Sequence, residues 1–270
     1  MKNIKKILAV IDDSTVSKEI LKKSIELGSM FDAGIIILHT IHIPFFNLPL
    51  YNNVPLDKES VKLSINTIFD ELNREAGVEH HTLVYFGDTT QRMIIEANRD
   101  DVDLVIGGSN LKFDKFLREV NKSILVVKEV SKVYENILIP TDLSEKSKNA
   151  IGFVKNSFVK GQFSLVYGYE SIAMVTSMYD INTVDMVEYQ EQNREMACDA
   201  LKKFREELDI EGVLINSCFS LPSRLLEYIE EKKPDLVVVA SHSGKDELFL
   251  GSTSGYLAKE SSSDVLIFCQ

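Results

Sequence analysis

Apolar residues along the chain gather into short continuous runs instead of alternating with polar residues. Five runs lie in each half of the sequence, and most are followed by a longer segment with a helical pattern. Continuous runs are typical of strands that are buried on both faces of a parallel sheet. The predicted strands are residues 7–11, 35–38, 82–85, 104–106, 124–127, 137–139, 165–167, 213–215, 236–240 and 265–268.

The segments between these runs predict helices. One begins at Ser14, carries apolar residues on one side and stops at Gly28, since glycine commonly ends helices. Two others, 89–98 and 223–231, come directly before the fourth strand of each half, and Pro222 leads into the second of them. Strands that alternate with helices predict right-handed βαβ crossovers. We therefore expect two Rossmann-like or flavodoxin-like α/β domains, each with a doubly wound sheet of five parallel strands.

The two halves of the chain also repeat each other, which predicts that they superpose with the first strand of each at the centre of its sheet. Residues 7–14 (ILAVIDDS) match residues 137–144 (ILIPTDLS) at an offset of 130. Later strands match at offsets of 132 and then 141, so the second copy holds nine extra residues before its last strand. We expect a tandem duplication with domains at 1–130 and 134–270, joined by a short charged link.

Composition excludes several classes of protein. A length of 270 residues suits two domains, and 44% apolar with 26% charged residues is ordinary for a globular chain. No run of apolar residues is long enough for a membrane span, and the basic, apolar N-terminus is expected to be the first strand, not a signal peptide. The net charge of −11 disfavours nucleic acid as a partner. Three widely spaced cysteines predict a reducing cytoplasm.

Candidate chemistry lies in the second copy. In an open α/β sheet, ligands bind at the carboxyl ends of strands where the winding reverses, which here means residues 140–142 and 240–254. The second stretch contains the extra residues. Its small residues let backbone N–H groups approach an anion, and Gly251 precedes a helix whose N-terminus favours negative charge. The hydroxyl groups of the three residues after Gly251 add donors for phosphate oxygens.

These stretches resemble the universal stress protein family, of the tandem type, over nearly all of both halves. The family's ATP-binding members carry a Gly-x-x-Gly, nine residues and Gly-Ser/Thr after the fourth strand, and an Asp beside the adenine after the first strand. Asp142 and Asp12 match that Asp, and Gly251-Ser252 match the closing pair. Ala240 and Ser243 replace both leading glycines. Seven residues, not nine, separate Ser243 from Gly251.

The resemblance implies a site for ATP, ADP or AMP, with Mg²⁺ if ATP, in the second domain. It implies none in the first, which lacks a closing Gly-Ser pair. It also implies a cytoplasmic stress-response protein that acts through binding, with its two domains packed face to face like the family's homodimer and with further self-association as a homodimer. The expected cofactor-binding residues are Pro140, Thr141, Asp142, Gly168, Ala240, Ser241, His242, Ser243, Gly244, Gly251, Ser252, Thr253 and Ser254.

Plainer interpretations stay open for these residues. The glycine-containing loop is equally consistent with a surface connection that caps a helix, and Asp142 with a carboxylate that stabilises a turn. His242 and Lys245 are candidate phosphate contacts, although solvated side chains are the commoner case. The histidines at 39, 42, 80 and 81 lack the compact spacing of metal ligands, and no residues suggest a catalytic acid–base pair. Slow ATP hydrolysis is therefore a third choice.

An alternative function comes from an apolar stretch with two prolines at residues 41–51, whose counterpart is residues 172–179. Long loops on α/β sheets often act as lids or contact surfaces. We favour packing between the two repeats for these side chains. The competing hypothesis is a scaffold or a protein that binds an apolar ligand, with both nucleotide sites degenerate.

Overall fold

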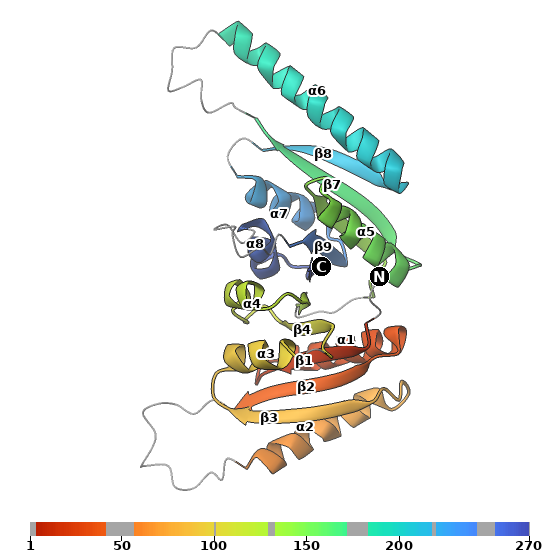
Figure 1. Ribbon diagram of the computed structural model, residues 1–270, viewed down its shortest axis with the longest axis vertical. Helices are drawn as coiled ribbons and strands as arrows, with labels where there is room; N and C mark the ends of the chain where they lie inside the picture. The colour runs from red at the N-terminus through yellow and green to blue at the C-terminus, as the bar shows by residue number, and fades with distance from the viewer. Residues whose placement is uncertain are drawn as a thin grey trace. The chain divides into compact units, whose positions relative to one another are not determined.

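The computed structural model divides into two compact units, one holding β1–β5 and the other β6–β10. Figure 1 colours the first unit from red to yellow-green and the second from green to blue. The structure describes residues 4–41, 57–99, 101–128, 133–171, 183–217, 220–241 and 252–269.

Each unit alternates strands with helices. The first contains β1 (Lys6–Ile11), α1 (Val16–Phe31), β2 (Gly34–Ile41), α2 (Lys58–Asn73), β3 (His80–Phe86), α3 (Thr89–Ala97), β4 (Leu104–Gly108), α4 (Phe113–Glu119) and β5 (Ser123–Val127). The second contains β6 (Asn136–Thr141), α5 (Glu145–Ser157), β7 (Gln162–Glu170), α6 (Thr183–Leu208), β8 (Glu211–Ser217), α7 (Leu221–Lys232), β9 (Leu236–Ala240), α8 (Ser252–Glu260) and β10 (Asp264–Phe268). Every predicted strand is confirmed.

The sheet of the first unit has the order β3-β2-β1-β4-β5, and that of the second has the order β8-β7-β6-β9-β10. All of these neighbours pair in parallel. The two orders are equivalent, so β1 and β6 are the central strands, as the repeat predicts. The residues of β4, β5 and β10 are all buried. Cover on both faces explains why these strands are continuous apolar runs.

A repeated carboxylate contact fixes the start of each central strand. Asp103 Oδ2, just before β4, accepts hydrogen bonds from the backbone N–H groups of Lys5 (2.8 Å) and Lys6 (3.2 Å). Asp235 Oδ2, just before β9, accepts equivalent bonds from Glu135 (3.2 Å) and Asn136 (2.8 Å). Equivalent contacts in the two units support the duplication at the level of single hydrogen bonds.

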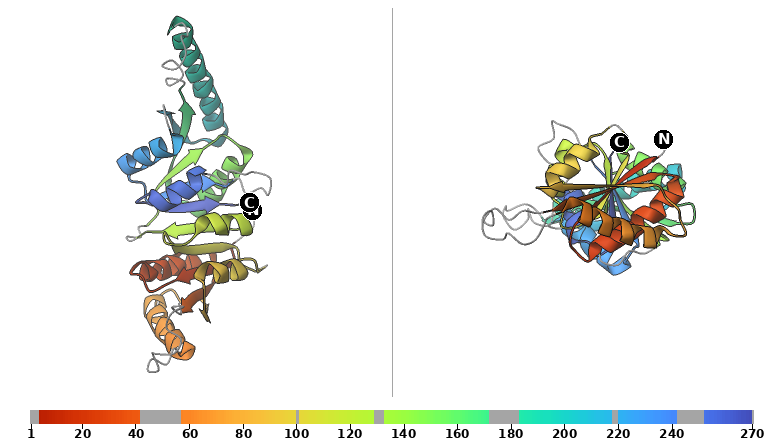
Figure 2. Two further views of the ribbon diagram at one scale, coloured as in Figure 1. Left: turned by 90° about the vertical axis from the view of Figure 1, so that its left-hand side faces the viewer. Right: turned by 90° about the horizontal axis from the view of Figure 1, so that it is seen from below.

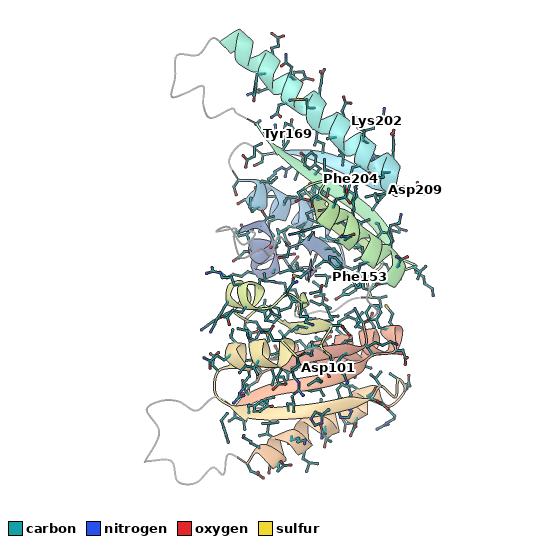
Figure 3. The ribbon with its side chains drawn as sticks, in the orientation of Figure 1. Asp101, Phe153, Tyr169, Lys202, Phe204 and Asp209 are labelled. Atoms are coloured by element: carbon teal, nitrogen blue, oxygen red, sulfur yellow. The ribbon has the colours of Figure 1, made fainter. Side chains whose placement is uncertain are left out.

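The helices of each unit lie on both faces of its sheet. In the first unit α1 contacts α2, and α3 contacts α4, as right-handed crossovers on either side of β1 require. Figure 2 shows these helices on both sides of the strands. In the second unit, Phe204 of α6 is buried while Lys202 of the same helix is exposed (Figure 3). No helix among the described residues has the length and apolar character that a membrane span needs.

The end of α1 corrects one sequence prediction. The helix does not stop at Gly28 but runs to Phe31, and Asp32 takes the left-handed conformation that ends it (φ 53°). Gly28 serves packing instead, because a Cβ atom there would lie 2.9 Å from Val78 Cγ1 and 3.1 Å from Ile35 Cδ1. The glycine lets α1 lie close against β2 and the segment before β3.

Candidate functional site

The turn after β6 is held by a network of short-range hydrogen bonds. Asp142 Oδ1 accepts from the backbone N–H of Ser144 (3.0 Å) and from the hydroxyl of Ser147 (2.6 Å). Ser144 in turn caps α5, since its hydroxyl accepts from the N–H of Ser147. Leu143 has a left-handed backbone (φ 62°), and its N–H donates to Thr141 Oγ1 at 3.0 Å. The network places the exposed side chain of Asp142 at the end of the central strand.

The turn after β1 repeats this arrangement at an offset of 130 residues. Asp12 Oδ1 accepts from the N–H of Ser14 (2.9 Å) and from the hydroxyl of Ser17 (3.0 Å). The Ser17 hydroxyl also accepts from the N–H of Asp12 at 3.0 Å. Both candidate aspartates therefore stabilise a strand-to-helix turn, whatever else they do.

In the first unit, the turn after β4 also contacts Asp12. The side-chain amide of Asn110, which follows β4, donates a hydrogen bond to Asp12 Oδ2. Partial burial raises the pKa of Asp12, but hydrogen bonds from Ser14, Asn110 and Ser17 together hold the pKa below its usual value. Groups of the same unit thus satisfy both oxygens of this carboxylate.

Replacing Asn110 with alanine is expected to raise the pKa of Asp12, because one hydrogen bond to the charged form is lost. A folded pKa below the unfolded one contributes stability above the unfolded pKa, and that stability is lost as pH falls through the folded pKa. The variant should therefore lose part of its pH dependence of stability at the acid end. A carboxyl ¹³C NMR titration of Asp12 measures the shift directly.

The control is Asn98→Ala in the same unit, because the Asn98 amide donates to the backbone carbonyl of Glu119 and not to Asp12. An Asp12 pKa that is the same in Asn110→Ala and in the wild type would contradict the assigned contact.

The turn between β4 and α4 is short and folds over the end of its strand. Only residues 109–112 connect the two elements. A Cβ atom on Gly107 would lie 2.3 Å from Leu111 Cδ1, and one on Gly108 would lie 3.0 Å from Asn110 Oδ1. Leu111 and Asn110 therefore occupy the space next to the end of β4.

The corresponding connection in the second unit is longer, because β9 ends at Ala240 and α8 begins at Ser252. Since β6 and β9 are parallel neighbours, their carboxyl ends lie at the same edge of the sheet, where its winding reverses. Ser241 is buried, and its N–H donates to the carbonyl of Phe268 at 2.8 Å. On α8, Ser254 is buried and Thr253 is half-buried.

Gly168 directly follows Tyr167, which pairs with Thr141 at the end of β6. It belongs to β7 and pairs with Ile215 of β8. A Cβ atom on Gly168 would lie 2.0 Å from Leu221 Cδ1 at the start of α7. The glycine thus makes room for Leu221, a packing role that its sequence position alone does not reveal.

Several predicted residues lie outside the described part of the chain. These are His242, Ser243, Gly244 and Gly251, together with Lys245 and the apolar stretches at 42–51 and 172–179. Of Ser252, only its place as the first residue of α8 is described. In the described part, no group of three or more His, Cys, Asp or Glu side chains is placed to hold a metal ion.

Comparison with known proteins decides the family. A model of the universal stress protein family matches residues 3–128 and, a second time, residues 133–268. The chain belongs to the universal stress protein family. The double match confirms the tandem type. A search of curated proteins finds no match.

Solved structures agree with the universal stress protein fold. A universal stress protein from Archaeoglobus fulgidus matches with a TM-score of 0.68 and 15% identity, covering 98% of this chain and 96% of its own. A functionally unknown protein from Pseudomonas aeruginosa matches with a TM-score of 0.67 and 14% identity, covering 98% and 92%. At such identities the likeness shows the fold alone.

Sequence reasoning missed the partners of the two aspartates. Ser17 and Ser147 stand five residues after Asp12 and Asp142, at the same offset as the aspartates themselves, so the repeat held a signal for them. Asn110 had no such signal, because its contact joins residues 98 positions apart.

Proposed function

We propose that this universal stress protein is a stress-response protein that binds one adenine nucleotide per chain, in its second unit. The site lies at the carboxyl ends of β6 and β9, between Asp142 and the N-terminus of α8. The protein acts through binding and the resulting change in conformation, not through turnover. We expect it to work in the cytoplasm as a homodimer.

The asymmetry of this proposal rests on the connection after the fourth strand, which is short in the first unit and places Asn110 against Asp12. A nucleotide in the first unit would have to displace Asn110 from the carboxylate and Leu111 from above Gly107. In the second unit, the longer connection before α8 supports a ligand-binding loop, since it supplies backbone N–H groups next to a helix N-terminus. Asp142 would fix the base side of the ligand, while Pro140 and Thr141 shape the adjoining turn.

The residues of the loop predict weak binding or a preference for fewer phosphates than ATP carries. Ala240 and Ser243 stand where the family's ATP-binding members have glycine. A Cβ atom restricts both a positive φ and the close approach of the backbone to a phosphate.

Calorimetric titration with ATP, ADP and AMP, with Mg²⁺ for ATP, is expected to give one site per chain. Gly251→Val should abolish binding, because the side chain blocks the backbone approach before α8. Asp142→Ala should weaken binding by about tenfold, the effect expected for loss of one hydrogen bond to a charged group.

Asp12→Ala is the matched control, because it removes the equivalent turn contacts from the first unit and should leave the affinity unchanged. Two sites per chain, no binding, or a site that survives Gly251→Val would each refute the proposal.

A further inference from the structure

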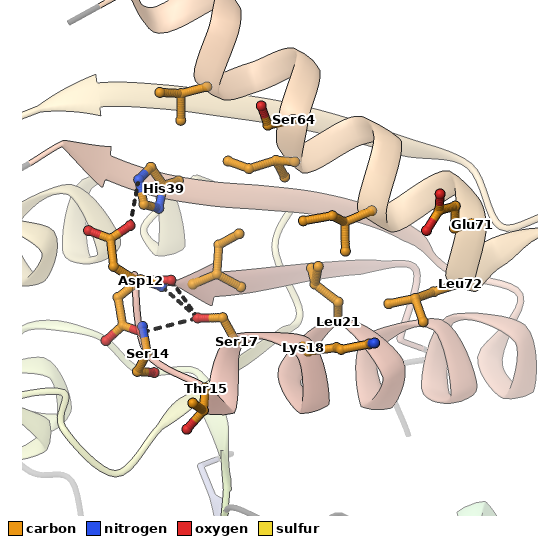
Figure 4. A pocket seen from close by; sticks show the side chains of 15 residues that line it. Asp12, Ser14, Thr15, Ser17, Lys18, Leu21, His39, Ser64, Glu71 and Leu72 are labelled. Carbon is orange, nitrogen blue, oxygen red and sulfur yellow. Dashed lines mark hydrogen bonds and ion pairs between the residues drawn. The ribbon is translucent and has the colours of Figure 1, made fainter. Parts of the chain in front are cut away.

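A cavity of about 640 Å³ lies between α1 and α2 on one face of the first unit's sheet (Figure 4). This volume is within the usual range of small-molecule sites, which is about 300–1,000 Å³. Its walls come from β1, α1, β2 and α2, and it also reaches the turn after β1 that carries Asp12.

The deep part of the cavity is apolar. Leu21 of α1 and Ile65 of α2 are buried and face it, and Ile11 at the end of β1 lies behind them. Val61 and Leu72 of α2 extend the apolar wall along the helix. Such a surface suits the hydrocarbon part of a ligand, because burial of apolar area is the main driving force for binding in such pockets.

His39 of β2 marks the polar end of the cavity. Only 6% of this residue is exposed, and its Nδ1 atom is buried without a hydrogen-bond partner among the described residues. The Nε2 atom lies 3.9 Å from Asp13 Oδ1, which is beyond a hydrogen bond (Figure 4). An unsatisfied buried nitrogen is costly and uncommon in folded proteins. With the ring proton on Nε2, which faces Asp13, Nδ1 is a hydrogen-bond acceptor, and a ligand that donates to it would satisfy it.

The charges around the cavity select the kind of head group. Three carboxylates line it, from Asp12, Asp13 and Glu71, against the single ammonium group of Lys18 among the described lining residues. A negative surface repels carboxylates and phosphates and attracts cations. The head group should therefore be neutral or positively charged.

We propose that the cavity binds a small amphiphile with an aliphatic body and a head group that donates hydrogen bonds and carries no negative charge. The head donates to His39 Nδ1, and the body lies between Leu21 and Ile65. This site is in the first unit and is independent of the nucleotide site proposed for the second.

Three probes that share a linear hydrocarbon chain and differ in head group test which head groups the cavity accepts: 1-octanol, octylamine and octanoate. Titration of the full-length protein is expected to show saturable binding of the alcohol and the amine. Octanoate should bind at least about tenfold more weakly, because its carboxylate accepts hydrogen bonds only and meets three like charges. The ¹⁵N chemical shift of His39 Nδ1 should move on binding of either donor probe.

A pair of variants on α2 tests the location. Ser64 and Thr67 are both exposed, and each donates its hydroxyl to the carbonyl four residues earlier, but only Ser64 lines the cavity. Ser64→Trp should abolish binding by filling the cavity, whereas Thr67→Trp should leave it unchanged. His39→Leu should weaken both donor probes by about tenfold, the cost of one hydrogen bond, while His81→Leu at an exposed position should not.

Octanoate binding as tightly as octylamine would overturn the head-group assignment. Absence of saturable binding by any probe, or binding that persists in Ser64→Trp, would overturn the site itself. Because Ser64 is exposed, this variant tests the site even if His39→Leu fails to fold.

Discussion

Replacing Phe69 with alanine is expected to lower the free energy of unfolding of the first unit by about 3–5 kcal/mol. Phe69 is 0% exposed and holds α2 against the sheet, where its ring lies 4.3 Å from the ring of His80, measured between centroids. Truncation would remove this contact and leave a cavity.

Native-state hydrogen exchange can measure this loss separately for the two units. Protection should fall in β2 and β3 and change little in β6 and β7. Leu63→Ala on the same helix is the control, because Leu63 is 69% exposed and its truncation should cost no more than about 0.5 kcal/mol. A loss below about 1 kcal/mol for Phe69→Ala would show that α2 does not depend on this residue.

The second large loss of stability is expected when Tyr134, in the second unit, is replaced with phenylalanine. Its hydroxyl donates to Asp264 Oδ2 at 2.6 Å, and both residues are buried, at 5% and 3% exposure. Tyr134→Phe keeps the ring that packs edge-on against Phe158 but removes the donor. A buried carboxylate oxygen that loses a donor should cost about 1–3 kcal/mol of stability.

Urea denaturation, or hydrogen exchange of β10, should detect this change. Tyr189→Phe provides the comparison, because Tyr189 is 51% exposed on α6 and its hydroxyl can exchange partners with water. If the two variants were equally stable, the bond between Tyr134 and Asp264 would contribute nothing measurable.

The strands were predictable from sequence because each unit covers both faces of its sheet. Burial on both faces removes the alternation of polar and apolar residues, and β4 and β9 therefore stand out as unbroken apolar runs. The end of α1 was not predictable in this way. Gly28 has the residue type of a helix end, but its close contact with Val78 depends on a segment fifty residues away.

The candidate sites also combine features that the sequence predicts with features that it does not. The positions of Asp12 and Asp142 follow from the repeat, because a carboxylate after a central strand is a local feature. The bond from Asn110 to Asp12 depends on how the turn after β4 folds back, and the burial of His39 Nδ1 without a partner among the described residues depends on tertiary packing. Neither arrangement leaves a local pattern in the sequence.

The serine contacts of Asp12 and Asp142 have a consequence for how a duplicated protein can change. Each aspartate binds the serine five residues later, so selection for a stable turn is enough to retain it in both copies. A copy can therefore lose its ligand and still keep the residue that once marked the site. In this chain the informative difference is the connection after the fourth strand, which is short in the first unit and places Asn110 against Asp12. The loss of a ligand from one copy is therefore easier to recognise in the turn after the fourth strand than in the aspartate.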